Sequence, residues 1–204
     1  MNASVFQQVE ESNTRLKDWG WCDLDKALTL ASIVVAMRPK LIVEIGVYGG
    51  RSLQAFAIAL KHLGAGRVVG IDPWSKDAAL ESMGDEANRL WWSHLDYERV
   101  YRTCMENLSI SGVNDFVSIL RQRSDDVDPS GWELDVLHVD GSHEEPAFRD
   151  VTRYGARVRI GGICVCDDTK WSSGAPQRGV EWLLANGFIE LYPLGTGAVF
   201  QRIK

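Results

Sequence analysis

One stretch sets the architecture of the chain: Leu41-Ile42-Val43-Glu44-Ile45-Gly46-Val47-Tyr48-Gly49-Gly50-Arg51-Ser52. Its first five residues are mostly apolar and branched, which is typical of a parallel strand buried on both faces. A glycine turn follows, and then Leu53, Phe56, Ala57 and Leu60 stand at helical spacing. This strand, turn and helix predict the nucleotide site of an open α/β sheet, because glycines let the backbone approach a ligand and the helix start offers free N–H groups.

Composition points to one ordinary globular domain. The chain has 204 residues, of which 45% are hydrophobic and 25% charged. Its net charge of −6 argues against a non-specific nucleic-acid surface and an anionic membrane surface. No apolar run has the length of a membrane span, and residues 1–11 lack a signal-peptide pattern. The four cysteines include no C-x-x-C pair, so a zinc site is not expected and reduced thiols in a cytoplasm fit best.

The alternation of strand and helix continues along the chain. Further strands are predicted at 67–72, 116–120, 134–140 and 161–168, and residues 188–192 and 198–203 form a terminal hairpin. A helix is expected to begin near Pro146, with Phe148, Val151 and Val158 on its apolar side. Right-handed crossovers between the first five strands predict a parallel sheet with helices on both faces.

Two segments lie outside this alternation. Residues 1–39 are interpreted as an N-terminal helical cap on a core of residues 40–204, within a single domain over 1–204. The polar segment 73–95 contains Trp74, Trp91 and Trp92 and is interpreted as a lid insertion. Ordinary packing of these tryptophans is an equal alternative.

The spacing Glu44-x-Gly46-x-x-Gly49-Gly50 resembles motif I of the class I S-adenosylmethionine-dependent methyltransferases, and differs from the G-x-G-x-x-G of dinucleotide-binding proteins. A glycine-rich turn without a ligand is the alternative. The resemblance covers the chain from about residue 40 to residue 203. It implies a Rossmann-like α/β fold with a seven-stranded, mostly parallel sheet of order 3-2-1-4-5-7-6, in which the last strand is antiparallel.

This resemblance also implies S-adenosylmethionine as the cofactor. Glu44 would reach its ammonium group directly or through water, Asp72 would accept hydrogen bonds from the ribose hydroxyls, and Ser124 would contact the adenine. The expected cofactor-binding residues are Glu44, Gly46, Tyr48, Gly49, Ser52, Asp72, Pro73, Ser124 and Asp140.

Acidic residues follow two of the predicted strands. Asp140 ends the strand 134–140, and Asp167 and Asp168 end the strand 161–168. Neighbouring strands lie about 4.8 Å apart, so three carboxylates would converge if these strands pair. Like charges at such distances need a cation or protons to neutralise them. Oxygen ligands without sulfur suit Mg²⁺ best, with Ca²⁺ or Mn²⁺ as alternatives.

The pattern Val-Asp-Gly-Ser-His at 139–143, followed by Gly-Gly-Ile-x-x-x-Asp-Asp at 161–168, is similar to the small metal-dependent O-methyltransferases. It is most similar to the macrocin O-methyltransferase type, methyltransferase family 24, and less similar to catechol O-methyltransferase. The resemblance implies that Asp140, Asp167 and Asp168 hold a divalent ion. His143 is expected to be the general base, because histidine titrates near neutral pH, and a helix-capping histidine is the alternative. His62 and His138 are expected to be structural.

We therefore expect an S-adenosylmethionine-dependent O-methyltransferase that uses a divalent metal and a histidine base. Its substrate would be a small molecule with a hydroxyl, such as a sugar, macrolide, phenol or polyol, with a vicinal diol as one option. The alternatives are a metal-independent methyltransferase, a non-catalytic cofactor-binding member and an NAD-dependent oxidoreductase, the last disfavoured by the glycine spacing. The oligomeric state is left open, with a homodimer as one option.

Overall fold

The structure, a computed structural model, describes residues 4–81 and 83–204. Residues 1–3 of the predicted cap and residue 82 of the predicted insertion lie outside the described residues. The described strands form one seven-stranded sheet of order β3-β2-β1-β4-β5-β7-β6, which confirms the expected order. β7 is antiparallel to both of its neighbours, and the other neighbouring strands of the sheet are parallel. The strands are β1 (Leu41–Ile45), β2 (Arg67–Ile71), β3 (Val117–Leu120), β4 (Leu134–Val139), β5 (Val158–Cys166), β6 (Phe188–Leu194) and β7 (Gly197–Arg202).

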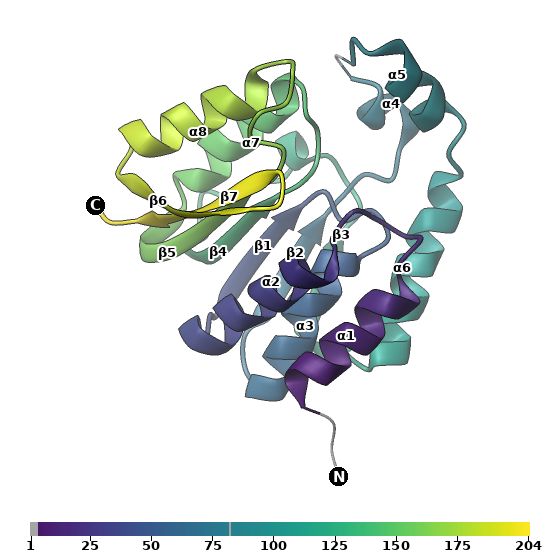
Figure 1. The fold of residues 1–204 in the computed structure, drawn as a ribbon, viewed down its shortest axis with the longest axis vertical. Helices are drawn as coiled ribbons and strands as arrows, with labels where there is room; N and C mark the ends of the chain where they lie inside the picture. Colours follow the sequence, from purple (N-terminus) through teal and green to yellow (C-terminus); the bar gives the residue numbers. More distant parts are fainter. Residues whose placement is uncertain (1–3, 82) are drawn as a thin grey trace.

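Helices cover both faces of the sheet (Figure 1). α1, α2, α3 and α6 lie on one face, α7 and α8 pack together on the other, and the short α4 and α5 stand apart at the upper right of the view. No helix among the described residues is long and apolar enough to cross a membrane. The helices are α1 (Val5–Arg15), α2 (Leu24–Met37), α3 (Arg51–Leu63), α4 (Lys76–Ala79), α5 (Glu86–Ser93), α6 (Tyr97–Ser111), α7 (Glu145–Gly155) and α8 (Ala175–Ala185), with short 3₁₀ turns at Asn114–Phe116 and Ser124–Asp126.

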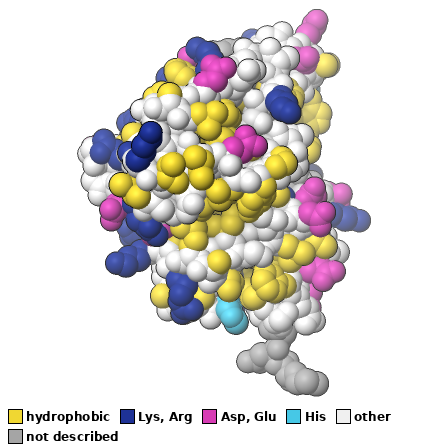
Figure 2. Space-filling model, turned by 60° about the vertical axis from the view of Figure 1, so that its left-hand side comes forward, with side chains coloured by type: hydrophobic (Ala, Val, Ile, Leu, Met, Phe, Trp, Pro, Cys, Tyr) yellow, Lys and Arg dark blue, Asp and Glu magenta, His cyan; other side chains and the backbone are white. Residues whose placement is uncertain are grey.

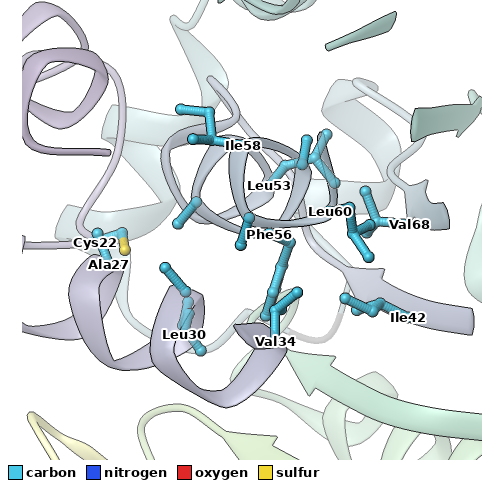
Figure 3. Packing of buried hydrophobic residues seen from close by; sticks show 14 of the residues in the cluster. Cys22, Ala27, Leu30, Val34, Ile42, Leu53, Phe56, Ile58, Leu60 and Val68 are labelled. Atoms are coloured by element: carbon cyan, nitrogen blue, oxygen red, sulfur yellow. The ribbon is translucent and has the colours of Figure 1, made fainter. Parts of the chain in front are cut away.

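The larger part of the core lies between α2, α3 and the sheet (Figure 3). Phe56 of α3 is fully buried and points toward Val34 of α2, close to Ile42 of β1. Every residue of α3 from Ser52 to Leu60 is buried, because α1, α2 and α6 cover the side of α3 that faces away from the sheet. The N-terminal helices α1 and α2 are therefore part of the core, and this packing holds α2 beside the strands.

The central strands β1 and β4 carry buried polar residues. Every residue of β4 is buried, since the strand has neighbours on both sides and helices on both faces. Glu44 of β1 stands opposite His138 of β4 in the parallel register. Buried polar groups in such strands need hydrogen-bond partners inside the protein, and the side chains of Glu44 and His138 are placed to partner each other.

Some predicted boundaries are wrong. α7 ends at Gly155, so Val158 opens β5 and does not belong to the apolar side of the helix. An apolar residue after a helix end fits either element, because periodicity alone cannot separate them. Phe116 lies in a 3₁₀ turn, and β3 begins at Val117. The segment 73–95 contains α4 and α5 and is more regular than expected.

The cysteines are free and buried. Cys164 and Cys166 lie on the same face of β5 with their Sγ atoms 3.6 Å apart, as their spacing predicts. Cys22 and Cys104 are also buried free thiols.

The side of the molecule formed by β6 and β7 carries hydrophobic side chains at its surface, with charged side chains around them (Figure 2). β6 is the last strand of the sheet. On it, Ile189, Leu191 and Tyr192 are 41%, 43% and 40% exposed. A shallow groove runs between Tyr192 and the outer side of α2.

Candidate active site

A cavity of about 640 Å³ lies at the C-terminal ends of the central strands. Its walls come from the glycine turn after β1, the ends of β2, β4 and β5, the loop before α2 and the segment 73–92. Ligands of open α/β sheets bind at this edge. The predicted site residues that line it are Gly46, Tyr48, Ser52, Asp72, Pro73, Ser124, Asp140, His143, Asp167 and Asp168.

The glycine turn passes very close to the neighbouring strand end. Gly46 has a φ of +85°, and a Cβ atom at this position would lie 2.2 Å from the carbonyl oxygen of Asp140. Gly49 is buried against Trp19 and does not line the cavity. Glycine is required at both positions so that the β1 turn, the β4 end and the loop before α2 can meet without side chains between them.

Asp72 fastens the glycine turn to the end of β2. Its Oδ2 accepts hydrogen bonds from the amides of Val47 and Tyr48, at 3.0 and 2.9 Å, and its Oδ1 accepts one from the amide of Trp74 at 2.7 Å. Burial raises the pKa of Asp72, although the three amides oppose that shift. The carboxylate therefore shapes the pocket through the backbone as well as facing it.

Glu44, which is expected to reach a cofactor ammonium group directly or through water, does not line the cavity. It is fully buried, and its Oε1 accepts a hydrogen bond from the hydroxyl of Ser52, which does line the cavity. The same oxygen lies 2.8 Å from Nδ1 of His138. Oε2 has no hydrogen-bond partner among the described residues. Glu44 thus reaches the cavity through Ser52.

A lysine that the sequence analysis missed occupies the acidic end of the cavity. Nζ of Lys26, in the first turn of α2, lies 2.9 Å from Oδ2 of Asp140 and also donates to Oδ2 of Asp167. The lysine is only 7% exposed. His138 lies behind this group, with Nε2 3.6 Å from Oδ2 of Asp167. The signal in the sequence was the position of Lys26 four residues before Leu30, on the same side of a largely apolar helix.

These charges offset one another. Burial disfavours a charged lysine, but the adjacent Asp140 and Asp167 outweigh it and raise the pKa of Lys26. Burial also opposes ionisation of Asp167, but His138, Asp140 and Lys26 outweigh it and lower its pKa. Burial and the charge of Asp167 raise the pKa of Asp140 to about 7. In the same way, Asp167 and Glu44 overcome burial and raise the pKa of His138 to about 9. Lys26 and His138 therefore lie among the carboxyl groups of Glu44, Asp140 and Asp167, and opposite charges within this buried group stabilise one another.

His143 and Asp168 form a separate pair at the mouth of the site. Nε2 of His143 lies 2.8 Å from Oδ2 of Asp168, and the imidazole packs on the ring of Trp171 with 4.5 Å between centroids. Burial disfavours the imidazolium, but the hydrogen bond that Nε2–H donates to Asp168 outweighs it and raises the pKa of His143. The same hydrogen bond lowers the pKa of Asp168. With Nε2–H donated to Asp168, Nδ1 is the nitrogen left to accept a proton.

The predicted metal ligands are thus divided between two groups. Among the described residues, the clusters that bring three ligand atoms within 4.8 Å of one another are His138–Asp140–Asp167 and Asp140–His143–Asp168. The three aspartates do not form such a cluster by themselves. Lys26 occupies the first group, and the hydrogen bond of His143 occupies Asp168 in the second.

The tryptophans play both of the roles weighed for them. Trp74 is 4% exposed, packs against Tyr101 and donates from Nε1 to the carbonyl oxygen of Tyr48, so it is a packing residue. Trp92 lines the cavity together with Trp21 of the loop before α2, and their rings lie 5.9 Å apart. The segment 73–95 therefore supplies both core and wall.

Known proteins resemble the chain both in sequence pattern and in fold. The family model described as a methyltransferase domain matches residues 43–169, from the middle of β1 to just beyond β5. No curated protein sequence matches the chain.

Several solved structures share the fold. The chain is similar to the O-methyltransferase NovP, with 15% identity, coverage of 98% of each chain and a TM-score of 0.75. It is also similar to the O-methyltransferase TomG from Streptomyces achromogenes, involved in tomaymycin synthesis and solved with S-adenosylmethionine, with 16% identity, coverage of 100% of this chain and 92% of TomG, and a TM-score of 0.67. An O-methyltransferase from Bacillus cereus, solved with S-adenosylhomocysteine, gives 17% identity, 100% and 92% coverage, and a TM-score of 0.64.

Proposed function

The chain belongs to the methyltransferase domain family, and on that premise we propose that it transfers the methyl group of S-adenosylmethionine to a hydroxyl oxygen of a small molecule. One observation carries the proposal. A single cavity is lined at one end by the glycine turn and Asp72, and at the other by His143 and Asp168. A nucleotide cofactor and a base for a hydroxyl group would thus face the same space.

The cofactor would lie against the glycine turn. Asp72 keeps the turn in shape through the amides of Val47 and Tyr48, and Ser124 and Pro73 extend the same wall. The carbonyl oxygen of Ser124 is fixed by the hydroxyl of Tyr154 at 2.8 Å, which orients the loop that would meet the adenine. Ser52 would carry the influence of the buried Glu44 to the methionine end.

His143 would act as the general base. Asp168 accepts from Nε2, which holds the ring in one orientation and leaves Nδ1 for the substrate proton. The substrate hydroxyl would give its proton to Nδ1 as its oxygen bonds to the methyl carbon, and bound S-adenosylmethionine would supply that methyl group, with the electron pair of the broken C–S bond left on sulfur. The cofactor supplies the reactive methyl group, and the protein supplies alignment and charge.

A divalent ion does not fit between Asp140 and Asp167 as these residues stand. The ammonium group of Lys26 already lies against Oδ2 of both carboxylates, at the position such an ion would need. The proposed reaction therefore does not use the metal that the family resemblance implies. The arrangement favours the metal-independent alternative.

The substrate would be a ring-bearing small molecule. Trp21, Trp92 and Trp171 line the cavity, and indole rings offer large flat surfaces for stacking. Sugars, macrolides and phenols all present a hydroxyl on such a ring.

A titration of the full chain with S-adenosylmethionine and S-adenosylhomocysteine, followed by isothermal calorimetry, tests the cofactor. We expect one site per chain. Asp72→Ala should weaken cofactor binding by at least about tenfold, since removal of a carboxylate that accepts from three amides leaves these buried donors of the glycine turn unpaired. Asp77→Ala, an exposed aspartate in α4, is the matched control. Binding of NAD in place of S-adenosylmethionine would contradict the assignment.

Transfer from radiolabelled S-adenosylmethionine to a panel of phenols, sugars and macrolides tests the reaction. His143→Ala should lower transfer by about a hundredfold or more, the usual contribution of a positioned base. Cofactor binding without transfer to any member of a broad panel would favour a non-catalytic cofactor-binding protein.

We also propose that the exposed side of β6 pairs with a second copy of the chain. Ile189, Leu191 and Tyr192 are exposed hydrophobic residues on β6, the edge strand of the sheet formed by the described residues, and soluble proteins commonly cover such an edge. Light scattering after gel filtration should give twice the chain mass, and Leu191→Lys should return it to the monomer. A monomeric wild-type protein would contradict the proposal.

A further inference from the structure

Lys26 reaches the active site from a distant part of the sequence. It lies 114 residues before Asp140 and 141 residues before Asp167, yet its Nζ contacts Oδ2 of both. Lysine is rarely buried unless its charge is paired, and here two carboxylates provide that pairing. The contact joins α2 to the ends of β4 and β5.

The ammonium group of Lys26 is placed where it can contact a ligand in the cavity. Lys26 lines the cavity together with Asp140 and Asp167, so its tip borders the space in which the reaction would take place. An ammonium group has three N–H donors, and the described residues use two of them, on Asp140 and Asp167. One donor is left for a ligand in the cavity.

From this geometry we propose that Lys26 is the cation of the active site and takes the place of a divalent ion between Asp140 and Asp167. Its third N–H group donates a hydrogen bond to the substrate oxygen that accepts the methyl group. This inference rests on the proposed methyl transfer. The carboxylates hold the ammonium group in place, and the ammonium group stabilises the oxygen as its proton leaves for Nδ1 of His143. That oxygen then bonds to the methyl carbon, and the sulfur keeps the pair of the broken C–S bond.

This assignment also narrows the substrate class. A divalent ion with open coordination positions binds two neighbouring oxygens at once and so selects vicinal hydroxyls. A single N–H donor binds one oxygen. The site therefore takes an isolated hydroxyl group and has no requirement for a diol.

Mn²⁺ is a suitable probe, because its electron paramagnetic resonance signal reports binding without any substrate. We expect the wild-type full chain to bind no stoichiometric Mn²⁺. Lys26→Ala frees two carboxylates and should raise Mn²⁺ affinity by at least about a hundredfold, since it removes a positive charge a few ångströms from the ion. Lys26→Ala combined with Asp167→Asn should lose this site again. Lys26→Arg, which keeps the charge, and Lys17→Ala, an exposed lysine, should behave like the wild type.

The outcomes are distinct. Stoichiometric Mn²⁺ binding by the wild-type chain that Asp167→Asn abolishes would overturn the role of Lys26, whether or not Lys26→Ala folds. Failure of folded Lys26→Ala to gain a Mn²⁺ site would overturn it as well. S-adenosylmethionine binding, measured by calorimetry on the same samples, separates the two ideas. A wild-type chain that binds neither Mn²⁺ nor S-adenosylmethionine refutes the proposed function, whereas one that binds both refutes only the assignment of Lys26.

Discussion

At the residue scale, the pair His143 and Asp168 makes the stability of the protein depend on pH. The pKa of His143 is raised above its ordinary 6.5. The contribution of His143 to the free energy of unfolding is therefore complete below pH 6.5 and is lost as pH rises through the raised pKa. The pKa of Asp168 is lowered below its ordinary 3.8, so its contribution is present above that value and is lost as pH falls through the lowered pKa. Both contributions coexist between pH 3.8 and 6.5.

We therefore expect Asp168→Asn to destabilise the chain most near pH 5–6 and progressively less above about pH 7. Urea unfolding of wild type and variant at several pH values measures the difference in free energy of unfolding. Asp18→Asn, at an exposed aspartate, should show no such trend. A difference that grows steadily toward alkaline pH would contradict the pairing.

Much of the site could be predicted residue by residue, but not the partners of each residue. Asp140, Asp167 and Asp168 follow strand ends and His143 stands three residues after Asp140, so their place at the sheet edge follows from topology alone. Which carboxylate pairs with which cation depends on contacts between distant segments. Lys26 was missed because nothing near it in the sequence marks the aspartates it meets.

Glu44 illustrates the same limit in the opposite direction. The motif predicts that it reaches the cofactor directly or through water, and in the structure it hydrogen-bonds to Ser52 and His138 behind the cavity wall. Position in a motif predicts the neighbourhood of a side chain, and packing decides whether that side chain reaches the surface of the cavity.

At the scale of elements, the turn between β1 and α3 should be the least tolerant of change. Gly46→Ala combines a left-handed backbone with a clash against the carbonyl of Asp140, and we expect a loss of more than about 2 kcal/mol of stability. Gly64, which caps α3, also has a positive φ, but a Cβ there would meet nothing within 4 Å. Gly64→Ala should therefore cost only about 1 kcal/mol. Urea unfolding of both variants makes the comparison, and equal losses would contradict it.

The start of α2 should control how firmly Lys26 is held. Asp23 caps this helix by accepting a hydrogen bond from the amide of Lys26 at 2.8 Å. Asp23→Ala should cost about 1 kcal/mol of stability. Asp25→Ala, an exposed neighbour in the first turn, should cost no more than a few tenths, and thermal unfolding of the two variants distinguishes them.

Elements buried on both faces were the easiest to predict. The strands β1, β2 and β4 have near-continuous apolar residues, because helices cover them on both sides. The end of α7 was misplaced at Val158, where an apolar residue suits a helix or a strand equally. The helices α4 and α5 in the segment 73–95 could not be predicted from hydrophobic periodicity, because none of their described residues is buried.

At the scale of the whole molecule, the strand order was available only through the resemblance to methyltransferases, and the structure confirms it. Periodicity predicts strands and helices, but many orders satisfy the same handedness rule. The family match and the order agree, so the placement of the cavity at the switch between β1 and β4 follows.

Cofactor binding should stabilise the whole chain. S-adenosylhomocysteine at 100 times its Kd adds about 2.7 kcal/mol, which for a chain of this size raises Tm by roughly 5–10 °C. Differential scanning calorimetry measures the shift. NAD at the same concentration serves as the control, and an equal rise with NAD would contradict the assignment of the glycine turn.

The four buried thiols make the unmodified chain its own reporter of breathing motions. Burial raises the pKa of Cys22 to about 12, so almost no thiolate exists at neutral pH, and alkylation has to wait for local opening. Cys22 lies in the loop beside the cavity, Cys104 in α6, and Cys164 and Cys166 in the middle of the sheet. The order in which mass spectrometry finds them alkylated would give the order in which these regions loosen, and a ligand seated beside Cys22 would delay the first event.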